Sequence, residues 1–250
     1  MPVFFSGGSR ALKKAGTGPA TAKTKLGEGK AMKASGAALA INILAVVLSP
    51  AGQAADMGGH GFHKGALQAK IEYCIKCHGP SGRGYRGAYP IPRLAGQQVQ
   101  YLENQFKALS EHSRDNPTSK KFMVPVINSV SPDMQTAIAE YFSTLKARPA
   151  GDGPANIVAQ GKKFFELGDP DNNQPACAAC HGIDGKGADM VPSLAGQMYA
   201  YTVAQLKGWG KGYRTKDPVS PENPNTMRPI AEGMTKEQIA AVAAYLSRLD

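Results

Sequence analysis

Apolar residues follow a helical period in two segments that lie far apart in the chain. Each segment contains apolar pairs three or four positions apart, formed by Ile138, Tyr141, Phe142 and Leu145 in one segment, and by Ile239, Val242, Leu246 and Leu249 in the other. Such spacing places apolar groups on one face of a helix. A Ser131-Pro132 pair precedes the first segment, and the capping-box pattern Thr235-Lys-Glu-Gln238 precedes the second. We therefore expect final helices that start near Ser131 and Thr235.

Four further segments are predicted to be helical, two in each half of the chain. Short helices are expected at about residues 64–73 and 156–167, and middle helices near residues 98–109 and 198–208. No segment shows the convincing apolar–polar alternation of a strand. The pattern therefore predicts an all-α protein.

These helices belong to an internal repeat. The stretch IPRLAGQQVQYLENQFKAL (91–109) matches VPSLAGQMYAYTVAQLKGW (191–209), and the segments at 123–145 and 227–249 also match. Between the copies lies ARPAGDGPAN (147–156), whose Pro, Gly and Ala content is typical of a linker. The repeat predicts two domains of about 100 residues each, a plausible domain size. Their expected bounds are 56–148 and 149–250.

The first 55 residues differ from the repeated part. Seven basic residues and one acidic residue accompany an apolar run of twelve, AALAINILAVVL (37–48), which small residues follow. This order is typical of a secretory signal. The run is shorter than the ~20 apolar residues of a membrane-spanning helix. We expect residues 1–55 to be a signal peptide. An uncleaved N-terminal anchor, with membrane association, is the alternative, and an ordinary buried helix is the weaker one.

The formal charge of +10 comes largely from this N-terminal segment. Residues 56–148 carry 12 basic and 7 acidic residues, and residues 149–250 carry 10 and 11. The basic residues are scattered, without the dense stripe of a nucleic-acid-binding protein. The positive first repeat instead favours weak, salt-sensitive docking onto an acidic partner.

All four cysteines lie in two C-x-x-C-H pentads, CIKCH (74–78) and CAACH (177–181). A thioredoxin-like pair would need a βαβ context. Zinc needs four ligands, whereas each pentad offers three, so one shared zinc ion is a weak alternative. The motif is typical of covalent haem attachment, in which the cysteines bond the vinyl groups and the histidine ligates iron. The predicted groups are Cys74, Cys77 and His78 for one haem, and Cys177, Cys180 and His181 for the other.

Haem iron bound by one histidine can take a methionine sulfur as its second ligand, which raises the reduction potential. Of nine methionines, only Met123 and Met227 occupy matching positions, each followed by x-Pro in a segment expected to be a polar loop. Core filling is the ordinary role of methionine, and it fits Met134 and Met234. His112 is a rival ligand for the first iron, but its repeat counterpart is a glycine.

These motifs resemble the class I cytochromes c, and their duplication resembles the dihaem cytochrome c4 family. The match covers about residues 64–250. The resemblance implies two tandem cytochrome c domains, each a small three- to four-helix fold around one covalently bound haem c with His/Met ligation. It also implies haem-pocket residues: the carbonyls of Pro92 and Pro192 accepting hydrogen bonds from the histidines, Leu94 and Leu194 packing on the haem, and Tyr101 and Tyr201 near the pocket or in the core.

The family's first helix carries a glycine that allows close crossing of the last helix. Gly161, with Phe165, matches this feature in the second repeat. The first repeat has Leu67 or Ala69 nearby, so the resemblance leaves its helix crossing open.

Six-coordinate iron leaves no position for a substrate. The resemblance therefore implies a periplasmic electron carrier and not an enzyme, passing single electrons between redox proteins of a respiratory chain towards a terminal oxidase. A membrane-bound oxidase or reductase would be its partner, with neither a small-molecule substrate nor nucleic acid. The alternatives are the cytochrome subunit of a dehydrogenase complex, as in sulfide or thiosulfate oxidation, a dihaem peroxidase and a ligand sensor. The paired Met123 and Met227 argue against the peroxidase.

Overall fold

The computed structural model describes residues 62–146, 148–215 and 225–250. Every named element in these ranges is a helix, and the extended pairings among them are isolated bridges. The all-α prediction is therefore confirmed. The predicted signal segment, residues 1–55, lies outside the described residues. Within the described part, no helix combines the length and the apolar character that crossing a membrane requires.

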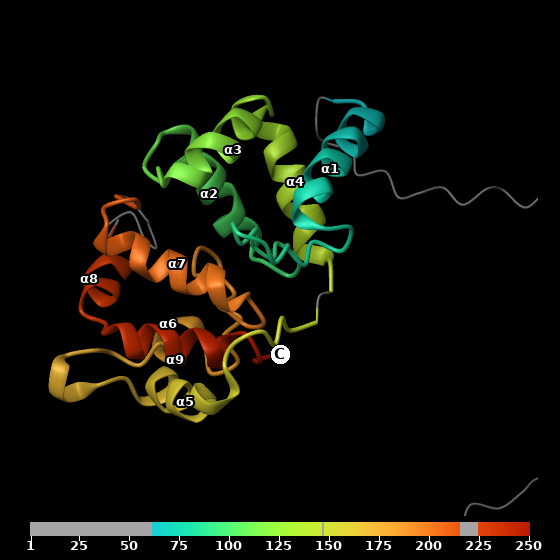
Figure 1. The fold of residues 1–250 in the computed structure, drawn as a ribbon. Coiled ribbons are helices and arrows are strands. Elements are labelled where there is room, and N and C mark those ends of the chain that lie inside the picture. Colours follow the sequence, from blue (N-terminus) through green and yellow to red (C-terminus); the bar gives the residue numbers. More distant parts are fainter. Residues whose placement is uncertain (1–61, 147, 216–224) are drawn as a thin grey trace, which may run out of the picture. The chain divides into compact units, whose positions relative to one another are not determined.

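The first repeat contains four α-helices (Figure 1). They are α1 (Lys64–His78), α2 (Val99–Ser110), α3 (Pro117–Asn128) and α4 (Pro132–Thr144). The predicted first, middle and final helices are confirmed. Helix α1 runs further than expected and includes the whole first pentad, so both cysteines and the histidine are held on one rigid helix.

Helix α3 was not predicted, and it corrects the expectation that Met123 lies in a loop. The Asn116 side chain accepts a hydrogen bond from the backbone N–H of Ser119 at 2.7 Å, and Pro117 occupies the first helical position. Pro125 lies inside the helix, where its missing N–H normally disfavours helix. The buried Val124 and Ile127 side chains anchor α3 to the core and offset that cost.

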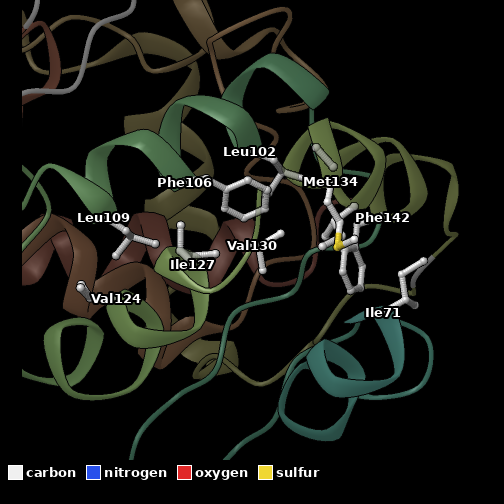
Figure 2. Packing of buried hydrophobic residues seen from close by; sticks show 11 residues of the cluster. Ile71, Leu102, Phe106, Leu109, Val124, Ile127, Val130, Met134 and Phe142 are labelled. Atoms are coloured by element: carbon white, nitrogen blue, oxygen red, sulfur yellow. The ribbon is translucent and has the colours of Figure 1, made fainter. Parts of the chain in front are cut away.

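All four helices contribute to the core of the first repeat (Figure 2). Figure 2 shows side chains from α1, α2, α3 and α4 converging on one cluster, among them Ile71, Leu102, Phe106, Val124, Ile127, Met134 and Phe142. Met134 is 8% exposed and Phe142 is 0% exposed. Met134 is thus a core residue, as predicted.

The second repeat follows the same order with additional short helices. Its elements are η1 (Ala155–Ile157), α5 (Val158–Leu167), η2 (Pro170–Asn172), α6 (Ala178–His181), α7 (Tyr199–Gly210), α8 (Met227–Glu232) and α9 (Lys236–Leu246). The capping box of Thr235 and Gln238 is present. Met227 begins α8, so the expectation of a loop is wrong here too. Met234 lies in the buried core of this repeat.

Helices α5 and α9 cross closely at Gly161, as the family resemblance implied. A Cβ atom at this position would overlap the carbonyl oxygen of Ala241. Phe165, one turn later, is fully buried in the second core. In the first repeat α1 also contacts α4, and Ile71 is the apolar residue that α1 buries.

Candidate haem sites

His78 ends α1 with one ring nitrogen engaged and the other without a partner. Its side chain is 5% exposed, and its Nδ1 lies 3.0 Å from the carbonyl oxygen of Pro92. Because a carbonyl can only accept, the proton resides on Nδ1 and the lone pair on Nε2. Nε2 is buried and makes no hydrogen bond. A buried, unpartnered lone pair is what an iron ligand requires.

The second pentad repeats the contact between histidine and proline. His181 ends α6, is 5% exposed, and places Nδ1 at 3.1 Å from the carbonyl oxygen of Pro192. Cys177 is half-buried and Cys180 is exposed, just as Cys74 is half-buried and Cys77 is exposed. The histidine–proline contact that the resemblance implied is therefore present in both repeats.

The remaining predicted residues lie at the edges of the two cores. Partly buried side chains that pack against the first cluster include Cys74, Leu94 and Met123. Their counterparts Cys177, Leu194 and Met227 pack against the second cluster. Each core thus brings an attachment cysteine, a leucine and a methionine to one apolar region, a lining that suits a large, flat, mostly apolar group.

The two half-buried thiols are poorly suited to redox catalysis. Burial raises the pKa of Cys74, and it raises the pKa of Cys177 to about 11. Catalytic thiols instead have a lowered pKa, because the thiolate is the nucleophile. The described residues also contain no group of three or more His, Cys, Asp or Glu side chains arranged to hold a metal ion, whereas structural zinc takes four ligands.

The electrostatic surroundings keep His78 neutral. Burial lowers its pKa, the Pro92 carbonyl opposes that shift by accepting from the protonated ring, and the charge of Arg114 lowers the pKa further. A neutral imidazole is the form that binds a metal ion. The rival ligand His112 is exposed, and its Nδ1 lies 3.5 Å from a carboxylate oxygen of Asp115.

Several polar residues that link the two repeats were missed by the sequence analysis. Arg114, 8% exposed, donates to Oε1 of Gln105 at 2.7 Å, to Oε1 of Gln205 at 3.2 Å and to the hydroxyl of Tyr201 at 2.7 Å. Arg214 donates to the same two glutamines at 3.0 and 3.2 Å. Tyr201 thus serves the contact between the repeats. The signal that could have revealed this network is the match of both arginines and both glutamines at an offset of 100.

A second set of contacts between the repeats involves the glutamine of each LAGQ motif. Gln97 is hydrogen-bonded to the backbone of Ser193, and Gln197 to the backbone of Arg93. Both glutamines are buried. They lie beside Pro92 and Pro192, whose carbonyls contact the histidines.

A helical domain whose C-x-x-C-H histidine is held by a backbone carbonyl defines a c-type cytochrome, and the arrangement occurs twice here. The family model described as cytochrome c matches residues 158–250. Cytochrome c-552 of Acidithiobacillus ferridurans is 37% identical over 209 residues, which are 83% of this chain and 86% of the relative. The thiosulfate dehydrogenase electron acceptor of Thiomonas intermedia is 36% identical over 177 residues, covering 70% and 77%.

A solved cytochrome c4 structure, from Acidithiobacillus ferrooxidans, matches with a TM-score of 0.63 and 37% identity, covering 71% of this chain and 99% of that one. The chain belongs to the cytochrome c4 family of dihaem cytochromes c. It therefore carries two covalently attached haem c groups, and its two C-x-x-C-H motifs account for both. Each haem supplies an iron that gains or loses one electron.

Proposed function

We propose that this protein is a periplasmic carrier that accepts one electron at a time from a reduced protein and delivers it to an oxidised one. The supporting observation is the equivalence of the two sites, each with a buried histidine oriented by a proline carbonyl and a methionine beside the same core. No bond to a substrate forms or breaks in such transfer. The predicted signal segment and the covalent haems support export.

The residue roles follow the two cores. Cys74 and Cys77 attach the first haem, and His78 and Met123 bind its iron. In the second site, the corresponding groups are Cys177, Cys180, His181 and Met227. Pro92 and Pro192 orient the histidines, and Leu94 and Leu194 pack against the rings. The domain bounds 56–148 and 149–250 are supported by two separate core clusters, one in each range.

Replacing the methionines tests these roles. Met123→Leu and Met227→Leu should each remove the iron–methionine absorption band of one oxidised haem and lower that haem's reduction potential, because the sulfur ligand raises the potential. Met134→Leu and Met234→Leu are matched controls, since both residues are buried core methionines. The controls should keep both bands. Retention of both bands in the Met123 and Met227 variants would contradict the ligand assignment.

The first repeat offers a surface suited to an acidic redox protein. Tyr73 and Phe122 are 54% and 51% exposed, and the ammonium groups of Lys76 and Lys121 lie 5.9 and 5.2 Å from their ring centroids. A groove between α1 and α3 lies beside Tyr73. The exposed Cys77 is one helical turn beyond Tyr73 on α1, so the haem attached there would adjoin this surface.

We take a membrane-bound oxidase or reductase as the partner at this surface. Electrostatic docking weakens as salt screens the charges. Oxidation of the reduced protein by native membranes should therefore slow as ionic strength rises. A rate that does not respond to salt would contradict docking through these lysines.

A second candidate function is electron acceptor of a dehydrogenase. It is favoured by the relative from Thiomonas intermedia, whose name gives it that role towards thiosulfate dehydrogenase. Rapid reduction of the oxidised protein by thiosulfate together with a thiosulfate dehydrogenase would support this candidate. Reduction no faster than with thiosulfate alone would exclude it.

A further inference from the structure

The peptide group between Pro92 and Arg93 has one partner in each repeat. Its carbonyl oxygen accepts from Nδ1 of His78 at 3.0 Å. Its N–H belongs to Arg93 and donates to Oε1 of Gln197 at 3.0 Å. Nε2 of Gln197 donates in turn to the Arg93 carbonyl at 3.0 Å. The histidine of the first repeat is therefore connected, through one peptide group, to a side chain of the second.

The same arrangement exists in the opposite direction. The peptide group between Pro192 and Ser193 accepts from Nδ1 of His181 at 3.1 Å, and its N–H donates to Oε1 of Gln97 at 2.7 Å. Nε2 of Gln97 donates to the Ser193 carbonyl at 3.0 Å. Each glutamine thus holds the peptide group that orients the histidine of the other repeat.

Both glutamine side chains are firmly fixed. Gln97 and Gln197 are 7% and 8% exposed. Besides binding the opposite repeat, Oε1 of each accepts the N–H of the next residue, Gln98 at 2.9 Å and Met198 at 3.0 Å. These N–H groups lie at the starts of α2 and α7. The amides are therefore held in one orientation in which both ends are satisfied.

We infer that Gln97 and Gln197 are positioning residues that lower the reduction potential of the haem in the opposite repeat. This inference rests on the proposed function. Hydrogen bonds in a chain polarise one another. When Gln197 accepts from the Arg93 N–H, the Pro92 carbonyl becomes a better acceptor for His78. A stronger bond at Nδ1 makes the imidazole a more basic ligand, which favours ferric iron.

Replacing each glutamine gives a crossed result. Gln197→Leu should raise the potential of the haem at His78, and Gln97→Leu should raise that of the haem at His181. We expect the oxidised-to-reduced equilibrium of the affected haem to shift by up to about twofold, because polarisation changes the strength of the neighbouring hydrogen bond by roughly 10–30%. The haem of the glutamine's own repeat should shift less. The measurement is a redox titration of the full-length, haem-loaded protein followed by NMR. The signals of the two haems can be told apart by their contacts with the two cores, because the single Trp209 lies in the second core.

Gln98→Leu is the matched control. Its Nε2 also donates across the repeats, to the carbonyl of Lys186 at 2.9 Å, yet it does not touch either proline peptide group. Both potentials should stay at wild-type values. The variants Gln97→Asn and Gln197→Asn, which keep the buried site polar but shorten the reach, should give the same crossed pattern at smaller amplitude and serve if a leucine variant does not fold.

The wild type and the glutamine variants test different statements: the wild type tests the proposed electron-carrier function, and the variants test the effect of the glutamines on the potentials. Suppose that the wild type has two reducible haems. If the glutamine variants then leave both potentials unchanged, or shift only the potential of the haem in the same repeat, the inference alone is overturned. A wild-type protein without two reversibly reducible haems would overturn the proposed function itself.

Discussion

Two helix starts that look similar in the sequence differ in one interaction. Ser131 precedes α4 with no hydrogen bond from its side chain to the helix. Thr235 precedes α9, and its hydroxyl accepts from the backbone N–H of Gln238 at 3.1 Å while the Gln238 side chain accepts from the backbone N–H of Thr235 at 2.9 Å. A proline at the first position of α4 supplies the helical φ angle there instead.

This difference predicts unequal effects of alanine. Thr235→Ala should lower the free energy of unfolding by about 1 kcal/mol, since it removes the hydroxyl that caps the backbone N–H of Gln238. Ser131→Ala should lower the free energy of unfolding by only a few tenths of that amount. Chemical denaturation of the two haem-loaded variants measures both values. Equal losses would contradict the role of the Thr235 hydrogen bond.

At the residue scale, the sequence revealed the groups whose spacing repeats and whose chemistry is distinctive. Cysteine, histidine and methionine at matching positions could be proposed as haem-binding residues without coordinates. Gln97 and Gln197 could not, although the LAGQ repeat was evident, because their partners are backbone groups 96 and 104 residues away. The sequence alone does not indicate which distant backbone group a glutamine side chain will bind, because only the fold brings the side chain and that group together.

At the element scale, Gly161 carries the contact between α5 and α9. We predict that Gly161→Ala destabilises the protein by about 1–3 kcal/mol, the usual cost of overpacking, because the new Cβ would overlap the Ala241 carbonyl and lie 2.9 Å from the Cβ of Tyr245. The effect should appear as an earlier unfolding midpoint with an unchanged visible spectrum of the folded protein.

Gly65 provides the control for this change. It lies in the first turn of α1, and nothing stands within 4 Å of a Cβ at its position. Gly65→Ala should leave stability unchanged or raise it by up to ~1 kcal/mol, because alanine loses less backbone entropy. A Gly161→Ala protein as stable as the wild type would mean that α5 and α9 can separate without cost.

The long helices with periodic apolar faces were predictable, whereas α3 and α8 were not. Both contain a proline, Pro125 in α3 and Pro229 in α8, and their methionines looked like loop residues. Helix propensity is a weak local preference that tertiary packing overrides. In α3 the packing of Val124 and Ile127 against the first core outweighs the low helix propensity of proline. Such an effect depends on neighbours that a sequence segment does not contain.

At the scale of the whole molecule, the two repeats are joined by buried polar contacts. The backbones at Arg114 and Arg214 form an antiparallel bridge, with Asp115 N–H donating to the Tyr213 carbonyl at 2.8 Å and Thr215 N–H donating to the Ser113 carbonyl at 2.8 Å. Buried donors and acceptors are costly when left unpaired. The contact therefore favours one relative arrangement of the repeats, which the crossed glutamine bonds also require.

A double-mutant cycle tests whether this contact is cooperative. Arg114→Leu removes the donor to the Tyr201 hydroxyl, and Tyr201→Phe removes the acceptor alone. We expect Arg114→Leu to cost about 1–3 kcal/mol, because it removes three hydrogen bonds and takes the donor from the Tyr201 hydroxyl, and the cycle to give a coupling energy of about 0.5–3 kcal/mol. Denaturation of the four haem-loaded proteins, monitored by far-UV circular dichroism, measures each corner of the cycle.

The exposed pair of Lys107 and Glu111 calibrates this measurement. Their charged groups are 3.8 Å apart, and the side chains are 72% and 49% exposed, so alanine at both positions should give a coupling energy below ~0.5 kcal/mol. Additive effects for Arg114 and Tyr201 would mean that the repeats are joined without this bond. A large coupling energy would instead show that burial makes the contact strong, and the fixed arrangement on which the crossed glutamine bonds depend would then have an energetic basis.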